Sequence, residues 1–235
     1  MARRPIEALD RPAVVARLSR HRVLGQIVRS DLEQLITFAH PRALAARARL
    51  FAAGEPGSAM FVLLSGWMKL SREGPAGRDI LLKVAGPGTM FGELAVVCGQ
   101  PRAADAVALT PVQLLSIDGR ALMTALRQNP DASLELVRML GERLARTTSQ
   151  MEDTLFLPAE ARLARALLRL AALNPTPEAG GLRIDLGLSQ RELGELAGLT
   201  RESINKQLSL WRDAGLIALD GRGVTLLDGP ALNEI

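Results

Sequence analysis

The middle of the chain is a series of short apolar runs separated by glycines. Runs at residues 59–64, 67–70, 80–84 and 112–117 have the length and the composition of strands. Several short strands at this spacing, with turn residues around them, predict a β-roll or jelly roll over roughly residues 43–118. The turn residues are Gly54, Gly57, Gly66, Gly74, Gly77, Gly86 and Gly88.

A jelly roll is also the fold of the cupin enzymes, which hold a metal ion with a cluster of histidines and a glutamate. The chain has two histidines, His21 and His40, and we expect both to lie upstream of the roll. No pair of a nucleophile and a base is visible either. We therefore expect no catalytic residue, no metal site and no catalytic cofactor, and an enzyme is the weakest interpretation.

The stretch from residue 91 to residue 105, F-G-E-L-A-V-V-C-G-Q-P-R-A-A-D, combines groups that suit a nucleotide. Gly92 can take a positive φ and lets a ligand approach the backbone closely. Glu93 is an acceptor for a sugar hydroxyl, and Arg102 is a planar donor for a phosphate. The small residues after Arg102 leave backbone N–H groups open to an anion. The glycine-rich motifs of dinucleotide and triphosphate sites are not present.

This stretch resembles the phosphate-binding cassette of cyclic-nucleotide-binding domains, which occur in the Crp/Fnr transcription regulators and in the regulatory subunits of cyclic-nucleotide-dependent kinases. The resemblance implies that Glu93 holds the ribose 2′-hydroxyl and that Arg102 pairs with the cyclic phosphate. The alternative is a structural ion pair between these two residues in a roll that has lost its ligand. We expect neither side chain to be needed in the hydrophobic core. The expected ligand-binding residues of the cassette are Gly92, Glu93, Leu94, Ala95, Arg102, Ala103 and Ala104.

Helical patterns flank the roll. Residues 1–40 carry apolar positions near a 3.6-residue period, which predicts short helices, one of them starting at Ser30-Asp31. A long helix is expected to start at Pro130 and to end before Pro158. Its apolar positions alternate steps of three and four residues, as in a coiled-coil seam that pairs two identical chains. The seam positions are Val137, Leu140, Leu144, Thr147, Met151 and Thr154.

Two adjacent hydroxyl residues, Thr147 and Thr148, stand at this seam, where a threonine weakens apolar packing. On its own, Thr147 is a tolerated polar position. In the cyclic-AMP receptor branch of the Crp/Fnr regulators, adjacent hydroxyl residues at the corresponding place meet the adenine, one of them across the dimer. The resemblance therefore adds Thr147 and Thr148 to the ligand site and makes cyclic AMP the expected effector.

The C-terminal part predicts a winged helix-turn-helix. An amphipathic helix over residues 159–173 is followed by a loop to residue 181. A capping box, S-Q-R-E at residues 189–192, opens a helix that turns at Gly198, and a second helix follows Thr200. Residues 216–218 and 224–227, around a turn at residues 220–223, are expected to form the β-hairpin wing.

The second helix of this motif has an apolar face with Ile204 and Leu208 and a polar face opposite. Arginine donates to guanine, glutamate accepts from cytosine, and lysine reaches guanine or phosphate. The alternative for Glu202 and Lys206 is a simple salt bridge on a solvated face. The run R-E-S-I-N-K resembles the recognition helix of the cyclic-AMP receptor branch, which usually has arginine at the position of Lys206. The expected DNA-binding residues are Ser189, Gln190, Thr200, Arg201, Glu202, Ser203, Asn205 and Lys206.

The formal net charge of +4 is weak evidence for DNA binding, because the basic excess lies away from this motif. Residues 1–50 hold ten arginines and four acidic residues, whereas residues 159–235 hold nine basic and ten acidic residues. A single cysteine, Cys98, excludes a disulfide framework and suits a reducing compartment. No apolar run approaches the ~20 residues of a membrane span, and no signal peptide is visible, so we expect a cytoplasmic protein.

These expectations describe an α+β chain in three parts. N-terminal helices and a cyclic-nucleotide-binding β-roll occupy residues 1–128, a dimerisation helix 129–157, and a winged helix-turn-helix 158–235. The expected protein is a homodimeric DNA-binding transcription regulator controlled by cyclic AMP. Its expected partners are the cyclic nucleotide, an operator with inverted TGTGA-like half-sites and RNA polymerase, with no membrane. The alternatives are a regulator of this family that responds to cyclic GMP, to a cyclic dinucleotide or to no ligand, and a nucleotide-binding interaction module that does not bind DNA.

Overall fold

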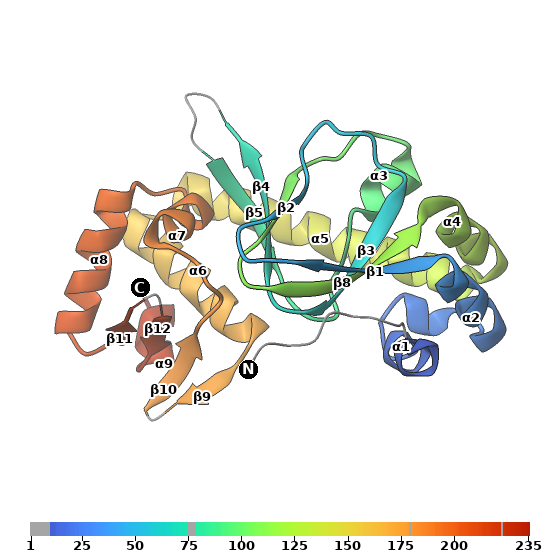
Figure 1. Ribbon diagram of the computed structural model, residues 1–235. Coiled ribbons are helices and arrows are strands. Elements are labelled where there is room, and N and C mark those ends of the chain that lie inside the picture. The colour runs from blue at the N-terminus through green and yellow to red at the C-terminus, as the bar shows by residue number, and fades with distance from the viewer. Residues whose placement is uncertain (1–9, 75–78, 179, 222) are drawn as a thin grey trace. The chain divides into compact units, whose positions relative to one another are not determined.

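The computed structural model describes residues 10–74, 79–178, 180–221 and 223–235, and Figure 1 labels its helices and strands. The chain divides into two compact units. One comprises Met1–Gly66 and Pro87–Thr147, and the other comprises Trp67–Gly86 and Thr148–Ile235. The predicted turn residue Gly77, the wing residue Arg222 and the basic residues at the N-terminus up to position 9 lie outside the described residues.

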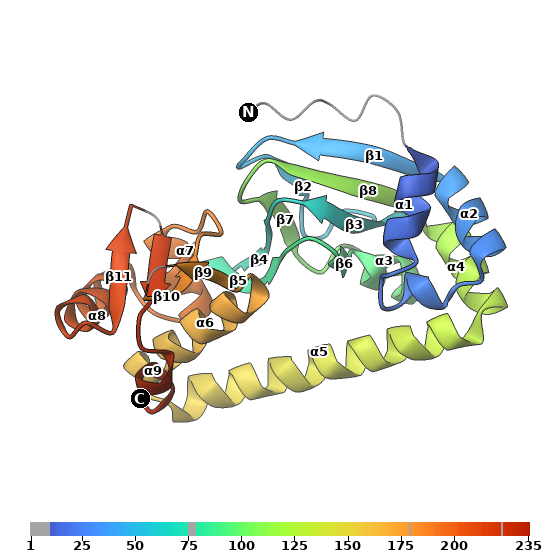
Figure 2. The ribbon, with the colours of Figure 1, turned by 90° about the horizontal axis from the view of Figure 1, so that it is seen from below.

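The first unit contains the predicted β-roll, which is built from antiparallel strands. One sheet has the order β1 (Ala39–Leu44), β8 (Val112–Asp118), β3 (Ala59–Ser65) and β6 (Met90–Phe91). The strands β1, β8 and β3 lie side by side in Figure 2. A second antiparallel pair joins β2 (Arg49–Phe51) to β7 (Asp105–Ala108).

The strands β1, β2, β6 and β7 were not predicted, because they are short or lack alternating apolar residues. Strand β1 contains Pro41 and Arg42, which are untypical of strands. Its position corrects one prediction, since His40 belongs to the first strand of the roll and does not lie upstream of it. The His40 side chain is exposed. The residues that the structure describes include no group of three or more His, Cys, Asp or Glu side chains that could hold a metal ion.

Four helical segments share a hydrophobic core with the larger sheet of the first unit. The core includes the fully buried side chains of Leu18, Leu24, Leu32 and Ile117. Burying one such side chain contributes about 1.5–3 kcal/mol, so this core fixes the end of the roll. The segments are α1 (Arg11–Leu18), the 3₁₀ turn η1 (Leu24–Gln26), α2 (Arg29–Thr37) and α4 (Gly119–Gln128).

Helix α2 begins at Arg29 and not at the predicted Ser30-Asp31. Its N-cap, Val28, provides no side-chain cap, and its N–H donates instead to Oδ1 of Asn129 at 2.8 Å. Nδ2 of Asn129 in turn donates to Oδ2 of Asp31 at 2.8 Å. The start of the helix is therefore set by a residue distant in the sequence, which a local capping pattern does not reveal.

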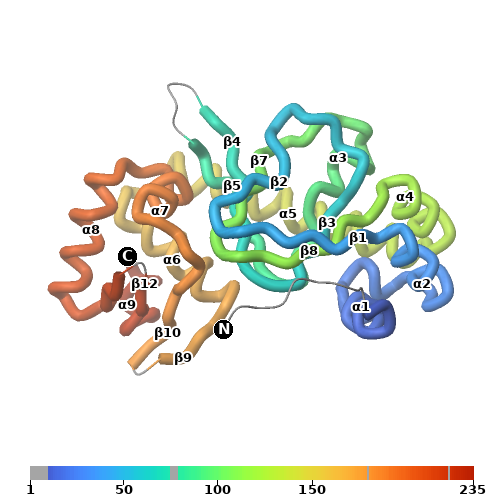
Figure 3. The backbone as a smooth tube through the Cα atoms, in the orientation of Figure 1, coloured from blue at the N-terminus to red at the C-terminus, as the bar shows by residue number. Residues whose placement is uncertain are grey.

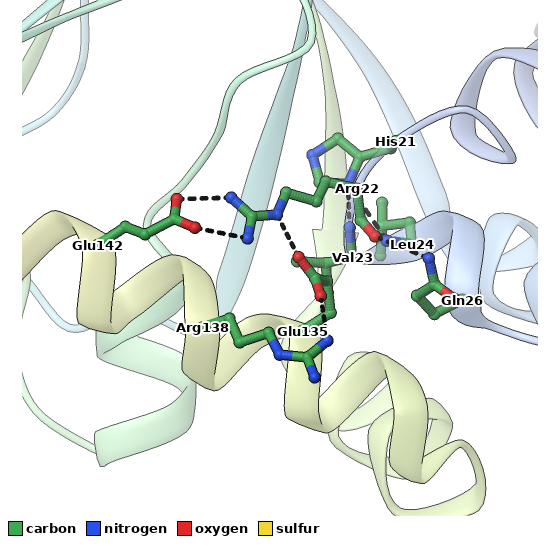
Figure 4. Close-up of polar contacts among 8 residues, drawn as sticks. All are labelled: His21, Arg22, Val23, Leu24, Gln26, Glu135, Arg138 and Glu142. Carbon is green, nitrogen blue, oxygen red and sulfur yellow. Dashed lines mark hydrogen bonds and ion pairs between the residues drawn. The ribbon is translucent and has the colours of Figure 1, made fainter.

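Arg22, in the segment between α1 and η1, connects the N-terminal helices to the long helix α5 (Pro130–Phe156) (Figure 4). Its guanidinium donates to both carboxylate oxygens of Glu142, at 2.6 and 2.7 Å, and also pairs with Glu135. The hydrogen bonds from Arg22 hold the pKa values of both carboxyl groups below their usual range. The neighbouring His21 accepts two backbone N–H groups at Nδ1, each at 3.2 Å.

Helix α5 starts at the predicted proline and runs through 27 residues without interruption (Figure 2). Three apolar side chains of the predicted seam lie open to solvent in the single chain: Val137 is 64% exposed, Leu144 69% and Met151 61%. The predicted limits of the three parts of the chain, after residues 128 and 157, stay a prediction.

The second unit combines a β-hairpin with a winged helical module, and Figure 3 traces both. The hairpin joins β4 (Met68–Glu73) to β5 (Asp79–Ala85). A sheet with the order β11-β12-β10-β9 belongs to the module. The elements of the module are α6 (Ala159–Leu173), β9 (Thr176–Glu178), β10 (Gly181–Ile184), α7 (Gln190–Ala197), α8 (Arg201–Asp213), β11 (Ile217–Asp220), β12 (Gly223–Leu226) and α9 (Gly229–Asn233).

The predicted helices and the wing of this module are confirmed, with β11 paired to β12 in an antiparallel register. The prediction of a loop up to residue 181 is wrong in part, because β9 pairs with β10 there. The strand was not predicted because β9 contains Pro177, and proline is untypical of strands. Proline is tolerated in β9 because this strand lies at the edge of the sheet. Of the helices that the structure describes, none has the length and hydropathy that a membrane span requires.

Candidate functional site

Gly92 opens the cassette with a left-handed backbone, at φ +77°. It precedes α3 (Glu93–Cys98), a short helix that the sequence pattern did not predict. A β-carbon on Gly92 would lie 2.7 Å from Nη1 of Arg102 and 3.2 Å from the ring of Phe61. Glycine is therefore required at this position for both the turn and the close approach of Arg102.

Arg102 lies inside the roll, with 7% of its surface exposed. Its Nη1 donates to the carbonyl of Gly92 at 2.9 Å, and its Nη2 donates to the carbonyl of Ala59 at 2.7 Å. The guanidinium carbon is 4.4 Å from the centroid of the Phe51 ring, in a cation–π contact. Burial lowers the pKa of Arg102, and the charge of nearby glutamates opposes this effect. Arg102 therefore packs on the aromatic residues of the roll. The expectation that the hydrophobic core does not need its side chain stays a prediction.

Glu93 is fully buried at the start of α3. Nη1 of Arg143, on α5, donates to its Oε1 at 2.5 Å. In the part of the chain that the structure describes, no ion pair joins Glu93 to Arg102, so the alternative of a simple pair between them is not formed. Arg143 was not predicted. It lies one helical turn before Thr147, and that spacing was a signal that could have found it.

Three buried atoms of this cluster make no hydrogen bond with any residue that the structure describes: Oε2 of Glu93, Nε of Arg102 and Nε of Arg143. An unpaired buried polar group costs about 1–3 kcal/mol and is rare in native proteins. One of the three atoms is an acceptor and two are donors. Together they complement a ligand that offers a hydroxyl group and an anion.

The other predicted cassette residues differ in exposure. Leu94 and Ala103 are exposed, Ala104 is half-buried, and Ala95 is buried. A β-carbon on Gly57 would lie 2.5 Å from Cβ of Ala95, so α3 packs closely on that part of the backbone. The small side chain of Ala95 therefore matches its position, while its role toward a ligand stays a prediction.

The two threonines lie on the surface of α5. Thr147 and Thr148 are both exposed in the single chain. The hydroxyl of Thr147 donates to the carbonyl of Arg143 at 3.0 Å, which links it along the helix to the residue that holds Glu93. A contact of either threonine with adenine stays a prediction.

The helix-turn-helix opens with the predicted capping box. The Ser189 hydroxyl accepts the N–H of Glu192 at 3.3 Å, and the Glu192 carboxylate accepts the N–H of Ser189 at 2.8 Å. Gly198, at φ +66°, makes the turn, and Thr200 caps α8 by accepting the N–H of Ser203 at 3.2 Å. The hydroxyls of Thr200 and Ser203 are hydrogen-bonded to each other at 2.9 Å. These side chains shape the motif, and their contacts with DNA stay a prediction.

The polar face of α8 forms a shallow hollow on the surface. Ile204 and Leu208 are buried on the opposite face, as predicted. Within the described residues, Glu202 and Lys206 form no ion pair with each other, so the salt-bridge alternative is not realised. Ser209 was not predicted as part of this face. The residues that line the hollow are Arg201, Glu202, Asn205, Lys206 and Ser209. Arg201, Glu202 and Lys206 are exposed, and so is the predicted Gln190 at the start of α7.

Comparison with known proteins agrees with both halves of this arrangement. Residues 41–129 match the cyclic nucleotide-binding domain, and residues 161–235 match the Crp-like helix-turn-helix domain. A CRP-like cAMP-activated global transcriptional regulator of Mycobacterium tuberculosis is 38% identical over 183 residues, which cover 78% of this chain and 82% of that protein. The chain belongs to the Crp/Fnr family of transcription regulators.

Other members of the family match a similar share of the chain. A global nitrogen regulator of Synechocystis sp. is 33% identical over 187 residues, 79% of this Crp/Fnr regulator and 83% of that protein. The crystal structure of a CRP-family transcriptional regulator from Thermus thermophilus matches with a TM-score of 0.70 and 28% identity, over 82% of this chain and 95% of that one. The predicted fold and class are confirmed: this chain is a DNA-binding, cyclic-nucleotide-binding transcription regulator, and its relatives are regulators and not enzymes.

Proposed function

We propose that this Crp/Fnr regulator binds cyclic AMP and, as a homodimer, binds an operator with two inverted TGTGA-like half-sites. The nucleotide site is the cluster around Glu93 and Arg102, and the polar face of α8 reads the DNA. RNA polymerase is the partner that such a regulator contacts at a promoter. Cyclic AMP binding changes the affinity of the dimer for its operator.

The observation that carries this proposal is the chemistry of the unpaired buried atoms. Oε2 of Glu93 is an acceptor, as a ribose 2′-hydroxyl requires, and Nε of Arg102 is a donor, as a cyclic phosphate requires. Arg143 holds the other oxygen of Glu93 at 2.5 Å, which orients the carboxylate for this role. A site that no longer bound a ligand would gain nothing from buried polar groups that make no hydrogen bond, and such groups destabilise the fold.

Three features favour cyclic AMP as the nucleotide. The hydroxyls of Thr147 and Thr148 can accept from the adenine amine, since a hydroxyl acts as donor or acceptor. Ala103 lacks a hydroxyl that would otherwise contact the phosphate or a guanine. The relative from M. tuberculosis, at 38% identity, is itself described as cAMP-activated.

The exposed seam of α5 supports the dimer. Val137, Leu144 and Met151 stand seven residues apart, and each exposes more than half of its surface in the single chain. A heptad spacing of apolar residues is the pattern that two helices bury between them. In such a dimer the ligand reaches the threonines of the seam, which couples nucleotide binding to the placement of the two α8 helices. Those helices read successive major grooves, about 34 Å apart.

The direct test is calorimetric titration of ligand-free protein with cyclic AMP, cyclic GMP and cyclic di-GMP. We expect cyclic AMP to bind most tightly. If cyclic GMP or cyclic di-GMP bound more tightly, that nucleotide would be the effector in place of cyclic AMP, and the assignment of the nucleotide site would stand. Absence of binding by all three would show that the cassette no longer serves a nucleotide of this class.

A further inference from the structure

Lys69 and Glu192 form an ion pair that is shielded from water. Nζ of Lys69, on β4, lies 3.0 Å from Oε1 of Glu192, on α7, and the two side chains are 14% and 6% exposed. Oε2 of Glu192 accepts both the N–H and the hydroxyl of Ser189, each at 2.8 Å. Burial alone would raise the pKa of Glu192, but the bonds from Ser189 and Lys69 outweigh it and hold the pKa at about 2. The carboxylate that completes the capping box is therefore also the anchor for a lysine of the hairpin.

The hairpin that carries Lys69 is packed against α7 and belongs to the same compact unit. Leu81, Val84 and Ala85 of β5 are buried. At the base of the hairpin, the ring of Trp67 lies so close to Gly86 that a β-carbon there would be 2.3 Å from it. The hairpin is thus a fixed support of the first helix of the helix-turn-helix.

The same hairpin is joined directly to the nucleotide cassette by the chain. Strand β5 ends at Ala85, and residues 86–91, which include β6, lead to Gly92 and Glu93. Because so few residues separate the cassette from the hairpin, a displacement of the cassette backbone on nucleotide binding would be passed along the chain to the hairpin. From the hairpin, the buried ion pair leads to α7 and, after the Gly198 turn, to α8.

We infer that Lys69 is a positioning residue for DNA recognition, which acts through Glu192 and transmits the state of the nucleotide site to the helix-turn-helix. The inference rests on the proposed nucleotide switch. It adds the ion pair between Lys69 and Glu192 as the contact that couples nucleotide binding to DNA binding.

The test compares operator affinity with and without saturating cyclic AMP, measured by fluorescence anisotropy on ligand-free, full-length protein. The ratio of the two dissociation constants is the coupling. The variants are Lys69→Met, Lys69→Arg, Glu192→Gln and the double variant Lys69→Met/Glu192→Gln. Glutamine at this position keeps the capping box while removing the charge. Glu195→Gln is the matched control, because Glu195 is a carboxylate of the same helix that pairs with Arg191 instead.

We expect the wild-type ratio to be at least about fivefold. Lys69→Met and Glu192→Gln should each reduce it to below about twofold, and the double variant should reduce it no further, because both remove the same contact. Lys69→Arg should restore most of the ratio, and Glu195→Gln should keep it. If Lys69→Met does not fold, Glu192→Gln with Lys69→Arg tests the same contact.

The contrary results are distinguishable. A wild-type ratio that persists in folded Lys69→Met and in Glu192→Gln would overturn the role of Lys69 and leave the switch intact. An equal weakening of DNA binding with and without nucleotide would mean that the pair only stabilises α7, which also overturns the inference. A ratio near one in the wild-type protein would refute the proposed switch and with it this inference.

Discussion

Arg143 of α5 donates to the buried carboxylate of Glu93 at 2.5 Å. This contact connects the helix that carries the exposed seam to the residue that we assign to the ribose. It also leaves Oε2 of Glu93 without a partner among the described residues. One arginine therefore orients the acceptor and ties the nucleotide cassette to the helix through which two chains are proposed to pair.

Replacing Arg143 by leucine should leave the Glu93 carboxylate buried without its counter-charge. Hydrogen bonds to charged groups are worth about 1.5–3 kcal/mol, so we expect cyclic AMP binding to weaken by that amount. Calorimetric titration measures it. Arg138→Leu is the control, since Arg138 is an exposed arginine of the same helix that pairs with Glu135. Unchanged nucleotide affinity in folded Arg143→Leu would show that the pair does not serve the ligand.

Replacing Arg102 by leucine should weaken cyclic AMP binding by about 2–5 kcal/mol, as expected for a buried, hydrogen-bonded charge that loses its partner. Because Arg102 also packs on Phe51, the same change should lower the free energy of unfolding. Arg102→Lys keeps the charge and loses the planar donor, so its nucleotide affinity should fall between those of wild type and Arg102→Leu. Wild-type affinity in Arg102→Leu would contradict the assignment of the phosphate site.

His21 should make the protein less stable in mild acid. Burial lowers its pKa, with a hydrogen bond to the Gly88 backbone opposing the effect, so the folded state favours the neutral ring. The contribution is fully present above the unfolded pKa of about 6.5 and is lost as the pH falls through the lower folded pKa. Urea unfolding at pH 7.5 and 5.5 should show a loss of less than about 1.4 kcal/mol per pH unit.

Two variants separate this effect from general acid sensitivity. His21→Asn removes the titrating group and should reduce the acid-dependent loss of unfolding free energy. His40→Asn changes an exposed histidine and should keep the wild-type loss. The same dependence on pH in His21→Asn as in wild type would contradict the prediction.

Leu144 should be needed for the dimer. It is 69% exposed in the single chain and stands in the middle of the α5 seam. Leu144→Glu places a charge on the apolar stripe of both partners, and we expect sedimentation analysis to show a monomer where wild type is a dimer. Leu173→Glu, at an exposed leucine at the end of α6, is the control. A wild-type protein that sediments as a monomer at micromolar concentration would contradict the proposed seam.

What the sequence predicted well is local. The capping box of Ser189 and Glu192 lies within one helical turn, so its two hydrogen bonds follow from four consecutive residues. The long helix starts at Pro130 because proline favours a first turn, whatever surrounds it. Periodicity also placed Ile204 and Leu208 in the core.

What it missed depends on contacts between distant residues. Arg143 meets Glu93, Lys69 meets Glu192, and Asn129 sets the start of α2, each across a long stretch of chain. No spacing rule connects such pairs before the fold is known. The burial of Arg102 was missed for the same reason, since one of its two aromatic partners, Phe51, comes from a strand that the pattern did not reveal.

The central claim is that a cyclic nucleotide controls DNA binding, and operator affinity with and without cyclic AMP tests it most directly. A fluorescence titration should use ligand-free wild-type protein and a palindromic site with TGTGA-like half-sites. Arg201→Ala serves as the control for specific recognition and should cost about 1–3 kcal/mol on that site. We predict that saturating cyclic AMP tightens specific binding of the wild-type protein by at least about 1 kcal/mol. Equally tight operator binding in both conditions would contradict the switch and leave a regulator whose DNA binding is independent of the nucleotide.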